Sequence, residues 1–288
     1  MFRAELRVRL WVLIVLFIVV LIVWLPVLSL AHDRQPYGAV LTVHYLDVGQ
    51  GDATFIETPD GIQVLIDGGP DDSVLRELGR QMGFFDKTID VIVATHPDKD
   101  HIGGLIDVLR RYRVSTVVLT ENEGDTPTAA TFVAAANMEG AEVIFARAGQ
   151  QLQLGASTTL AILFPLSDPT EMESNASSIV SQLHFGDIDF IFTGDSPQVI
   201  EEFLVEEYGE RLESEVLKVG HHGSKTSSAA TFVTAVHPDY AIISAGQDNR
   251  YGHPHREVLD RFSGTEVMGT YDQGTISITT DGTTVWVE

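Results

Sequence analysis

The segment His96–His101 places two imidazoles and two carboxylates within six residues. Nitrogen and oxygen donors this close together suit divalent cations of the zinc or manganese type. The apolar run 89–95 predicts a buried strand before the segment, and residues 102–109 predict a helix after it. The donors therefore lie where a strand ends in a loop, a common location for binding groups. If this segment is considered alone, the alternative to a metal site is a solvated polar turn.

Three further predicted strands are each followed by side chains that can bind a cation. These are Asp195 after 188–193, His221 and His222 after 216–219, and His253 after 239–244. Residues 224–227, Ser-Lys-Thr-Ser, supply donors for an anion. Taken singly, Asp195 could cap the helix that begins at Pro197, and His221 could be a buried histidine with satisfied nitrogens. The repeated order of strand followed by ligand favours a site over these separate structural roles.

Strands and helices alternate along the chain around these side chains. The other predicted strands are 39–46, 53–57, 62–67, 114–120, 142–146, 159–164 and 178–185, and the other predicted helices are 73–82, 127–138, 197–207, 228–236 and 254–262. Asp60-Gly61 and Asp281-Gly282 predict hairpins, since Asp-Gly between apolar runs favours a tight turn. The alternation predicts an α/β fold with sheets covered by helices.

The composition limits the chemistry. The chain has no cysteine, which excludes disulfides and thiolate ligands. Its 41 acidic and 18 basic residues give a formal charge of −23, so it should repel polyanions, which argues against a static, high-affinity DNA-binding module. An enzyme that meets phosphates at a metal is still compatible with this charge. Of four lysines in the chain, three lie in or beside the motifs and are expected near the site, namely Lys99, Lys218 and Lys225.

The N-terminus is a separate piece. Residues 10–31 carry no charge and are long enough to cross a bilayer as a helix. Arginines at positions 3, 7 and 9 predict that the short N-terminus is cytoplasmic, which places the rest outside the cytoplasm as a single-pass membrane protein. The alternative is a cleaved signal peptide ending at Ser29-Leu30-Ala31. Residues 32–38 are then expected to form a linker, and residues 39–288 the domain that carries the motifs above.

The chain resembles the metallo-β-lactamase superfamily, and within it the C-terminal hydrolase domain of ComEC-type DNA-uptake proteins. The resemblance implies an α/β fold, an αββα sandwich, here preceded by one transmembrane helix. The motifs that carry it are Asp47-Val48-Gly49-Gln50-Gly51-Asp52, Leu65-Ile66-Asp67-Gly68-Gly69, His96-Pro97-Asp98-Lys99-Asp100-His101-Ile102-Gly103-Gly104, Phe192-Thr193-Gly194-Asp195, Leu217-Lys218-Val219-Gly220-His221-His222-Gly223-Ser224 and Tyr251-Gly252-His253-Pro254.

The resemblance also implies two divalent metal ions, zinc or manganese. The implied ligands are His96, Asp98, Asp100, His101, Asn175, Asp195 and His221. Asp98 stands where many relatives have histidine. A carboxylate in place of an imidazole makes the site more suitable for manganese, so manganese is expected as an alternative to zinc. Asp195 matches the bridging aspartate of the superfamily, and Asp67 matches the buried aspartate that orients a ligand. His222 could replace His221 as the ligand or contact the substrate.

The activity implied is phosphodiester hydrolysis with DNA as the substrate. Single strands are expected to be preferred, because a flexible strand can reach the cations without laying a stiff duplex against a surface of charge −23. The expected catalytic residues are Asp100, Asp195, His253 and Lys225, and the expected substrate contacts are His222, Ser224, Lys225 and His253. ComEC-type proteins carry a multi-helix channel, so this chain would work beside a separate one. The alternatives are a hydrolase of non-nucleic phosphodiesters, such as choline-phosphate or wall-polymer groups, and a catalytically silent metal-binding module.

Overall fold

The structure is a computed structural model that describes residues 11, 13–14, 16–18, 20 and 40–288. The chain divides into a unit Met1–Pro36 and a compact unit Tyr37–Glu288. Most of the predicted membrane segment 10–31, and the whole of the linker 32–38, lie outside the described residues. Within the described residues, no helix is both long enough and apolar enough to cross a membrane.

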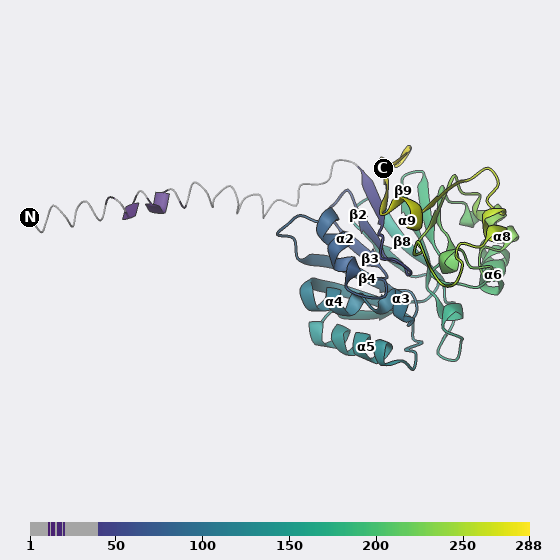
Figure 1. The fold of residues 1–288 in the computed structure, drawn as a ribbon, viewed down its shortest axis with the longest axis horizontal. Helices are drawn as coiled ribbons and strands as arrows, with labels where there is room; N and C mark the ends of the chain where they lie inside the picture. Colours follow the sequence, from purple (N-terminus) through teal and green to yellow (C-terminus); the bar gives the residue numbers. More distant parts are fainter. Residues whose placement is uncertain (1–10, 12, 15, 19, 21–39) are drawn as a thin grey trace, which may run out of the picture. The chain divides into compact units, whose positions relative to one another are not determined.

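Two sheets form the centre of the compact unit (Figure 1). The first has eight strands in the order β15-β14-β1-β2-β3-β4-β5-β6, and the second has seven in the order β13-β12-β11-β10-β9-β8-β7. The first sheet comprises β1 (Leu41–Tyr45), β2 (Thr54–Glu57), β3 (Gln63–Ile66), β4 (Thr88–Ala94), β5 (Arg113–Leu119), β6 (Glu142–Phe145), β14 (Ile276–Thr280) and β15 (Val285–Val287). The second comprises β7 (Gln151–Gln153), β8 (Thr158–Phe164), β9 (Val180–Phe185), β10 (Ile188–Phe192), β11 (Val216–Lys218), β12 (Tyr240–Ile243) and β13 (Glu266–Gly269).

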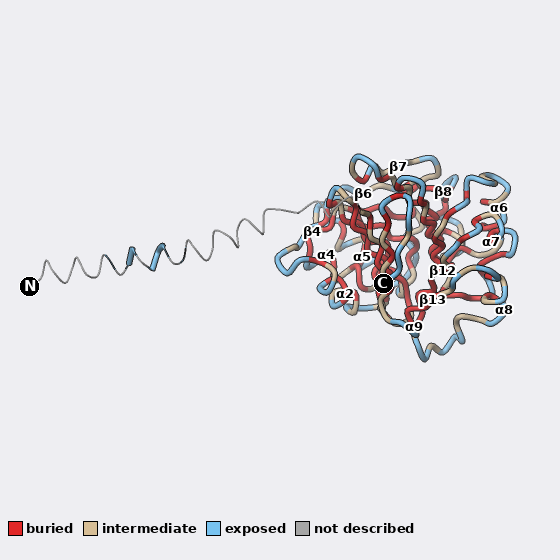
Figure 2. Tube along the Cα trace, turned by 90° about the horizontal axis from the view of Figure 1, so that it is seen from above, coloured by how far each residue is buried: buried red, intermediate tan, exposed pale blue. Residues whose placement is uncertain are grey.

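Helices cover the outer face of each sheet, so the unit has four layers. The helices are α2 (Ser73–Gln81), α3 (Lys99–Ile102), α4 (Leu105–Arg111), α5 (Pro127–Glu139), α6 (Gln198–Tyr208), α7 (Ala230–Val236), α8 (Arg256–Leu259) and α9 (Thr270–Gln273). One apolar cluster fills the space between the sheets, a second packs α2, α4 and α5 on the first sheet, and a third packs α6 and α7 on the second. Figure 2 shows the buried strands between these helices. The expected αββα arrangement is confirmed.

Alternating side chains explain why the central strands are apolar on both faces. In β3, Val64 and Ile66 point into the inter-sheet core while Leu65 packs under the helices. In β4, Val91 and Val93 join the core and Ile92 joins the helix layer. Successive side chains of a strand point to opposite faces, so a strand covered on both sides needs a continuous apolar run.

Parallel pairing brings distant loops to one edge. β3, β4, β5 and β6 run parallel in the first sheet, and β10, β11, β12 and β13 run parallel in the second. The carboxyl ends of neighbouring parallel strands lie at the same edge of a sheet. The loops after β4, β10, β11 and β12, which hold the predicted ligands, therefore emerge together.

Both predicted Asp-Gly hairpins are confirmed, since β2 pairs antiparallel with β3 and β14 with β15. The helix predicted over 102–109 is wrong as one element, because α3 ends at Ile102 and α4 begins at Leu105. The interruption lies at Gly104, whose N–H donates to the Gly69 carbonyl at 2.9 Å and so does not continue the hydrogen bonding of α3. The helix predicted over 254–262 is shorter than expected, since α8 covers only Arg256–Leu259.

Candidate metal centre

His101 is presented by the short helix α3 and oriented by a buried aspartate. Its Nδ1 lies 2.8 Å from Asp67 Oδ2, while Asp67 also accepts hydrogen bonds from the Thr95 backbone N–H at 2.8 Å and the Thr95 hydroxyl at 2.7 Å. An ionised carboxylate can only accept, so Nδ1 carries the proton. The other ring nitrogen, Nε2, is buried and makes no hydrogen bond. Asp67 therefore lies where an orienting residue is expected.

His96 lies directly after β4, with its ring centroid 4.1 Å from that of His101. Its Nδ1 is 3.1 Å from the Thr95 hydroxyl and 3.3 Å from the Ser178 hydroxyl. Its Nε2 is also buried without a hydrogen bond. Burial and the nearby His101 lower the pKa of His96, which favours the neutral imidazole that a cation requires.

Asp195 follows β10 and faces both histidine loops. Its carboxylate oxygens lie 3.3 Å from His101 Nε2 and 3.6 Å from His222 Nε2. Its backbone N–H donates to the Ser178 hydroxyl at 3.1 Å, which fixes the turn. Burial opposes ionisation, but the imidazoles of His101 and His222 hold the pKa of Asp195 well below its usual range. An ionised carboxylate between two imidazoles suits a shared ligand.

The two histidines of the next loop are placed differently. His222 is buried, with Nδ1 3.0 Å from the Ser244 carbonyl and Nε2 3.4 Å from Asp100 Oδ2. Burial opposes its protonation, but the Asp195 and Asp52 carboxylates raise the pKa of His222 to about 10. His221 has a side chain that is 25% exposed, and its Nδ1 contacts the Thr226 hydroxyl at 3.0 Å. His221 Nε2 is 3.7 Å from Asp195, yet His222 is the histidine that joins the buried clusters.

Asp52 is a site residue to which the sequence assigned no role. Its Oδ1 lies 3.1 Å from His222 Nδ1, and its Oδ2 forms an ion pair with the Lys218 ammonium. Burial would raise the pKa of Asp52, but Lys218 and His222 bring it well below its usual range. Lys218 lies beside the centre as expected, but it is buried and its charge is paired with Asp52. The pair joins the first sheet to the second beneath His222.

The remaining predicted ligands line the same centre. Asp98 has a side chain that is 42% exposed; its Oδ2 lies 3.8 Å from His96 Nε2, and its Oδ1 accepts a 2.6 Å hydrogen bond from the Ser174 hydroxyl. Asn175 follows Ser174 in the 3-10 turn Asn175–Ser177, and its buried Oδ1 makes no hydrogen bond. Ser174 and Ser178 thus support the ligand loops, although no pattern in the sequence indicated their partners.

The residues predicted to contact the substrate differ in how far they are buried. Lys225 is exposed at the end of the histidine loop, as is Lys99 on α3. His253 is half-buried, its ring centroid is 5.7 Å from that of His221, and its buried Nδ1 makes no hydrogen bond. Ser224 is buried with its hydroxyl 3.0 Å from the Thr226 hydroxyl, so it supports the loop from within.

Backbone hydrogen bonds hold three of these loops together independently of the ligand side chains. Asp52 N–H donates to the Asp100 carbonyl at 3.1 Å, and Gly69 N–H donates to the Asp52 carbonyl at 2.8 Å. Gly68 N–H donates to the His101 carbonyl at 2.7 Å, and Gly104 N–H donates to the Gly69 carbonyl at 2.9 Å. A Cβ on Gly51 would meet the Asp100 carbonyl oxygen at 2.3 Å, so glycine is needed for this close approach.

The arrangement fits divalent cations. Four overlapping groups of histidine and aspartate offer ligand atoms within 4.8 Å of one another. Buried polar atoms without hydrogen bonds are rare in proteins, and a bound cation would give them a partner. Several such atoms converge here, namely Nε2 of His96, His101 and His222, Oδ1 of Asp52 and Asp195, and Oδ1 of Asn175. The donors are nitrogen and oxygen, which suits zinc or manganese.

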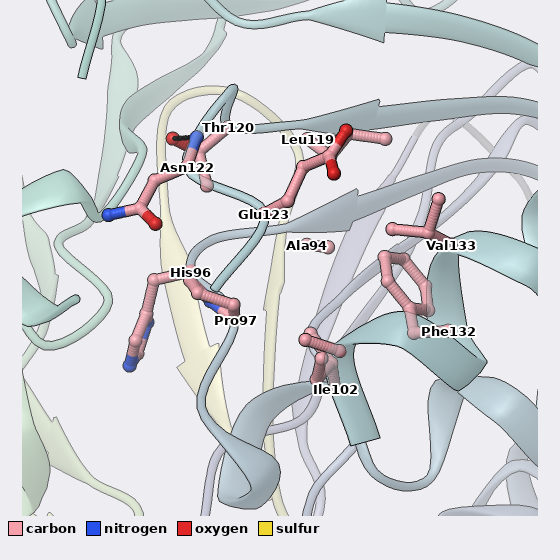
Figure 3. Close-up of a pocket in the computed structure, with 11 residues that line it drawn as sticks. Ala94, His96, Pro97, Ile102, Leu119, Thr120, Asn122, Glu123, Phe132 and Val133 are labelled. Atoms are coloured by element: carbon pink, nitrogen blue, oxygen red, sulfur yellow. Dashed lines mark hydrogen bonds between the residues drawn. The ribbon is translucent and has the colours of Figure 1, made fainter. Parts of the chain in front are cut away.

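A small hollow lies beside His96, between α5 and the ends of β4 and β5 (Figure 3). Its lining is mainly apolar and includes Leu119, Phe132 and Val133. The imidazole of His96 points away from these side chains (Figure 3). The volume is about 20 Å³, which is room for about one water molecule. This hollow is therefore packing space, on the other side of His96 from its imidazole.

Residues 46–247 match the family described as the metallo-beta-lactamase superfamily. The chain belongs to this superfamily. That assignment agrees with the two-sheet fold and with the histidine and aspartate clusters.

Curated relatives within the superfamily include three of the ComEC type. The chain is 32% identical to ComE operon protein 3 of Bacillus subtilis, over 81% of this chain and 32% of that protein. It is 32% identical to competence protein ComA of Neisseria gonorrhoeae, over 61% and 23%, and 30% identical to recombination protein 2 of Haemophilus influenzae, over 76% and 26%. The chain therefore spans about a third or less of the length of these relatives.

Solved structures share the fold at low sequence identity. The metallo-beta-lactamase fold protein YhfI of Bacillus subtilis has a TM-score of 0.54 at 12% identity, over 85% of this chain and 99% of that one. The diiron beta-hydroxylase CmlA of Streptomyces venezuelae has a TM-score of 0.51 at 16% identity, over 82% and 53%. At these identities the two structures show the fold alone, so the substrate of this chain must be argued from its own site.

Proposed function

We propose that this chain is a metal-dependent phosphodiesterase that cleaves single-stranded DNA. The observation that carries the hydrolase assignment is the convergence of unpartnered Nε2 atoms from His96, His101 and His222 on the Asp195 carboxylate. Buried polar atoms without hydrogen bonds do not stabilise the fold, and a bound catalytic cation would give them a partner.

Two sets of ligands would share Asp195. His96, Asp98 and Asn175 would hold one cation, and Asp100, His101 and His222 the other, with His221 as an alternative to His222. When bound, two divalent cations activate water and stabilise the attacking and leaving oxygens of a phosphodiester. The protein's part is to fix the imidazoles: Asp67 accepts a hydrogen bond from Nδ1 of His101 and the Ser244 carbonyl accepts one from Nδ1 of His222, which keeps both Nε2 atoms directed at the centre.

The catalytic roles proposed for this chain's own side chains follow from their positions. Asp100 is partly exposed beside His222, so its carboxylate can orient a water molecule at the open side. Lys225 and His253 lie at the rim, where they can hold non-bridging phosphate oxygens and reduce the charge that opposes attack. Ser224 contributes by shaping the loop that carries Lys225.

DNA as the substrate is supported by the names of the relatives, which are competence and recombination proteins. Single strands are preferred in this proposal because the chain carries a charge of −23. A flexible strand can bring one phosphate to the cations without laying a stiff duplex against an acidic surface.

One observation favours the second candidate, a hydrolase of small non-nucleic phosphodiesters. Lys218 forms an ion pair with Asp52, so Lys99 and Lys225 are the exposed lysines on the ligand loops. Two exposed lysines are too few to hold a long polyanion such as DNA along an acidic surface. A small ester needs no such track.

A substrate panel separates these candidates. The full chain in detergent is assayed with zinc and with manganese on labelled single-stranded DNA, bis-p-nitrophenyl phosphate and a choline-phosphate ester. We expect DNA cleavage that His101→Ala abolishes and Lys225→Ala slows at unchanged metal content. His184→Ala is the matched control, because His184 bonds Asp189 away from the centre. Activity on the small esters alone would move the assignment to the second candidate, and silence on every substrate with metal bound would indicate a binding module.

We also propose that residues 10–31 anchor the chain in the cell membrane with the catalytic unit outside the cytoplasm, beside a separate DNA-uptake channel. The support is the uncharged segment and the arginines before it. Protease added to intact spheroplasts should digest the catalytic unit. Protection of that unit would contradict this orientation, and release in high salt at reduced mass would indicate a cleaved signal peptide.

A further inference from the structure

The end of the first sheet that lies away from the metal centre exposes phenylalanine and basic side chains. Helices α2, α4 and α5 begin near the carboxyl ends of the strands and end near the starts of β4 and β5. Three contacts join the segments there: Arg113 N–H donates to the Lys87 carbonyl at 2.8 Å, the Lys87 ammonium lies 5.2 Å from the Tyr112 ring centroid, and Val114 N–H donates to Glu139. We call this surface, residues 83–87 and 110–113, the basal face.

Two adjacent phenylalanines form the tip of the basal face. Phe84 is 85% exposed and Phe85 is 66% exposed, in the turn between α2 and β4. Their rings meet edge to face with centroids 4.9 Å apart. Figure 1 shows this turn projecting from the body of the unit. Exposing two large aromatic rings side by side in water is costly, and such an exposed apolar group marks an interaction site.

Basic side chains surround the two phenylalanines. Lys87, Arg110, Arg111 and Arg113 are all exposed. Of the nearby acidic groups, Asp107 pairs with Arg110, while Asp86 and Glu139 accept hydrogen bonds only from neutral donors and keep their negative charge. Within residues 83–87 and 110–113, four basic side chains stand against one acidic side chain, so the basal face carries a net positive charge on a chain of formal charge −23.

We propose that the basal face binds an anionic lipid surface. Phe84 and Phe85 insert into the interface between headgroups and acyl chains, while Lys87, Arg111 and Arg113 lie against the headgroups. Apolar tips flanked by basic side chains bind such surfaces through combined burial and charge attraction. Nucleic acid fits less well, because single strands stack on open ring faces along a positive groove. Here the rings pack on one another at a projecting tip.

This docking would fix the direction in which the metal centre faces. The seven residues of β4 separate the basal face from His96, which at about 3.3 Å per residue is roughly 23 Å. The centre would thus open away from the lipid, toward substrate in the aqueous phase.

The test uses a reporter inside the compact unit of the full chain. The chain has no cysteine, and a Cβ at Gly83 would have only Asp86 Cβ near it, at 4.0 Å, so Gly83→Cys can carry a nitroxide beside both phenylalanines. With phosphatidylglycerol vesicles, the label should become accessible to oxygen and inaccessible to a water-soluble nickel complex. A label at Val199→Cys, on α6 and 66% exposed like Phe85, should stay in water.

Variants of the basal face show which groups are responsible. Each lost positive charge, as in Arg111→Ser, should lower the ratio of docked to free label roughly fivefold. Phe84→Ser with Phe85→Ser should abolish the lipid signal, and phosphatidylcholine vesicles should give little of it. A Gly83 label that stays in water with phosphatidylglycerol overturns the proposal. Protection of that label by an oligonucleotide without lipid would also overturn it in favour of a nucleic-acid surface.

Discussion

At the scale of single residues, the centre depends on fixing each buried imidazole through its Nδ1, on the side away from the cations. The Asp67 carboxylate bonds His101, and the Ser244 carbonyl bonds His222, beside which the Asp52 carboxylate lies at 3.1 Å, held by Lys218. A carboxylate behind a ligating histidine fixes the ring and its tautomer, and losing it commonly weakens metal affinity by about 10–100-fold. The first sheet supplies both carboxylates, although His222 belongs to the second.

Asp195→Ala should lower the bound metal well below the two ions expected for the native chain. The variant removes the carboxylate that lies within 3.3 Å of His101 Nε2 and 3.6 Å of His222 Nε2. Elemental analysis after dialysis against zinc or manganese measures the stoichiometry. Asp189→Ala removes a carboxylate outside the centre and should leave it unchanged. Full occupancy in the Asp195 variant would contradict its role as a shared ligand.

The sequence indicated most of these residues but not their pairings. Spacing identified the His96–His101 segment because donors so dense, in a loop directly after a buried strand, are typical of a metal site. The choice between His221 and His222 could not be made from sequence, since both have positive φ in one tight turn and only the fold decides which ring is buried. The sequence placed Lys218 near the site but did not indicate that it is buried and paired. Its burial depends on Asp52, 166 positions away.

At the scale of elements, glycines set how closely the loops approach. Gly104→Ala should destabilise the chain by about 1–3 kcal/mol, because its Cβ would meet two carbonyl oxygens at 2.1 and 2.3 Å that belong to backbone. Gly79→Ala on α2 is the matched control, since no atom lies within 4 Å of its Cβ, and it should stabilise by about 0.5–1 kcal/mol. Denaturant unfolding measures both, and equal effects would refute the steric argument.

Glu201 links α6 to the start of α7 beneath the histidine loop. Its carboxylate accepts hydrogen bonds from the Ser228 and Ala229 backbone N–H groups, and burial raises its pKa from 4.5 to about 7. The folded chain therefore binds more protons than the unfolded chain between these pH values. This group's contribution to stability is present below pH 4.5 and is lost as pH rises through 7, by roughly 3 kcal/mol.

Replacing Glu201 should change that pH dependence. In Glu201→Gln, the decline in unfolding free energy between pH 4.5 and 7 should shrink by roughly 3 kcal/mol relative to the native chain. Glu202→Gln, at the exposed neighbouring position, should keep the native slope. Parallel slopes for all three proteins would show that Glu201 titrates at its ordinary pKa.

Edge elements were the part of the fold that sequence patterns missed. β7 and β13 are the two edge strands of the second sheet, with three and four residues. β7 is largely exposed, so it lacks the apolar run that identifies a covered strand. Central strands such as β4 were found because helices and the second sheet bury both of their faces.

At the scale of the whole molecule, the charge of −23 should decide how salt affects turnover. Most nucleic-acid enzymes weaken as salt rises, because basic contacts are screened. Here the dominant long-range effect is repulsion, and salt shortens its range from about 30 Å at 0.01 M to about 10 Å at 0.1 M. The KM for single-stranded DNA should therefore fall over this range while that for bis-p-nitrophenyl phosphate changes little. A KM that rises with salt would point to a basic track on the protein.

The backbone hydrogen bonds among the Asp52, Gly68–Gly69 and Asp100–Gly104 loops indicate whether folding or metal binding comes first. Peptide groups and glycine contacts shape these loops, so the domain can fold first and acquire its cations afterwards. It should differ in this from zinc fingers, which are unfolded without metal. A chelator-treated chain should still melt cooperatively, with cations raising the midpoint only by mass action. Loss of cooperative melting on chelation would mean that metal is part of the folding nucleus, and an exported chain would then need its cations during maturation.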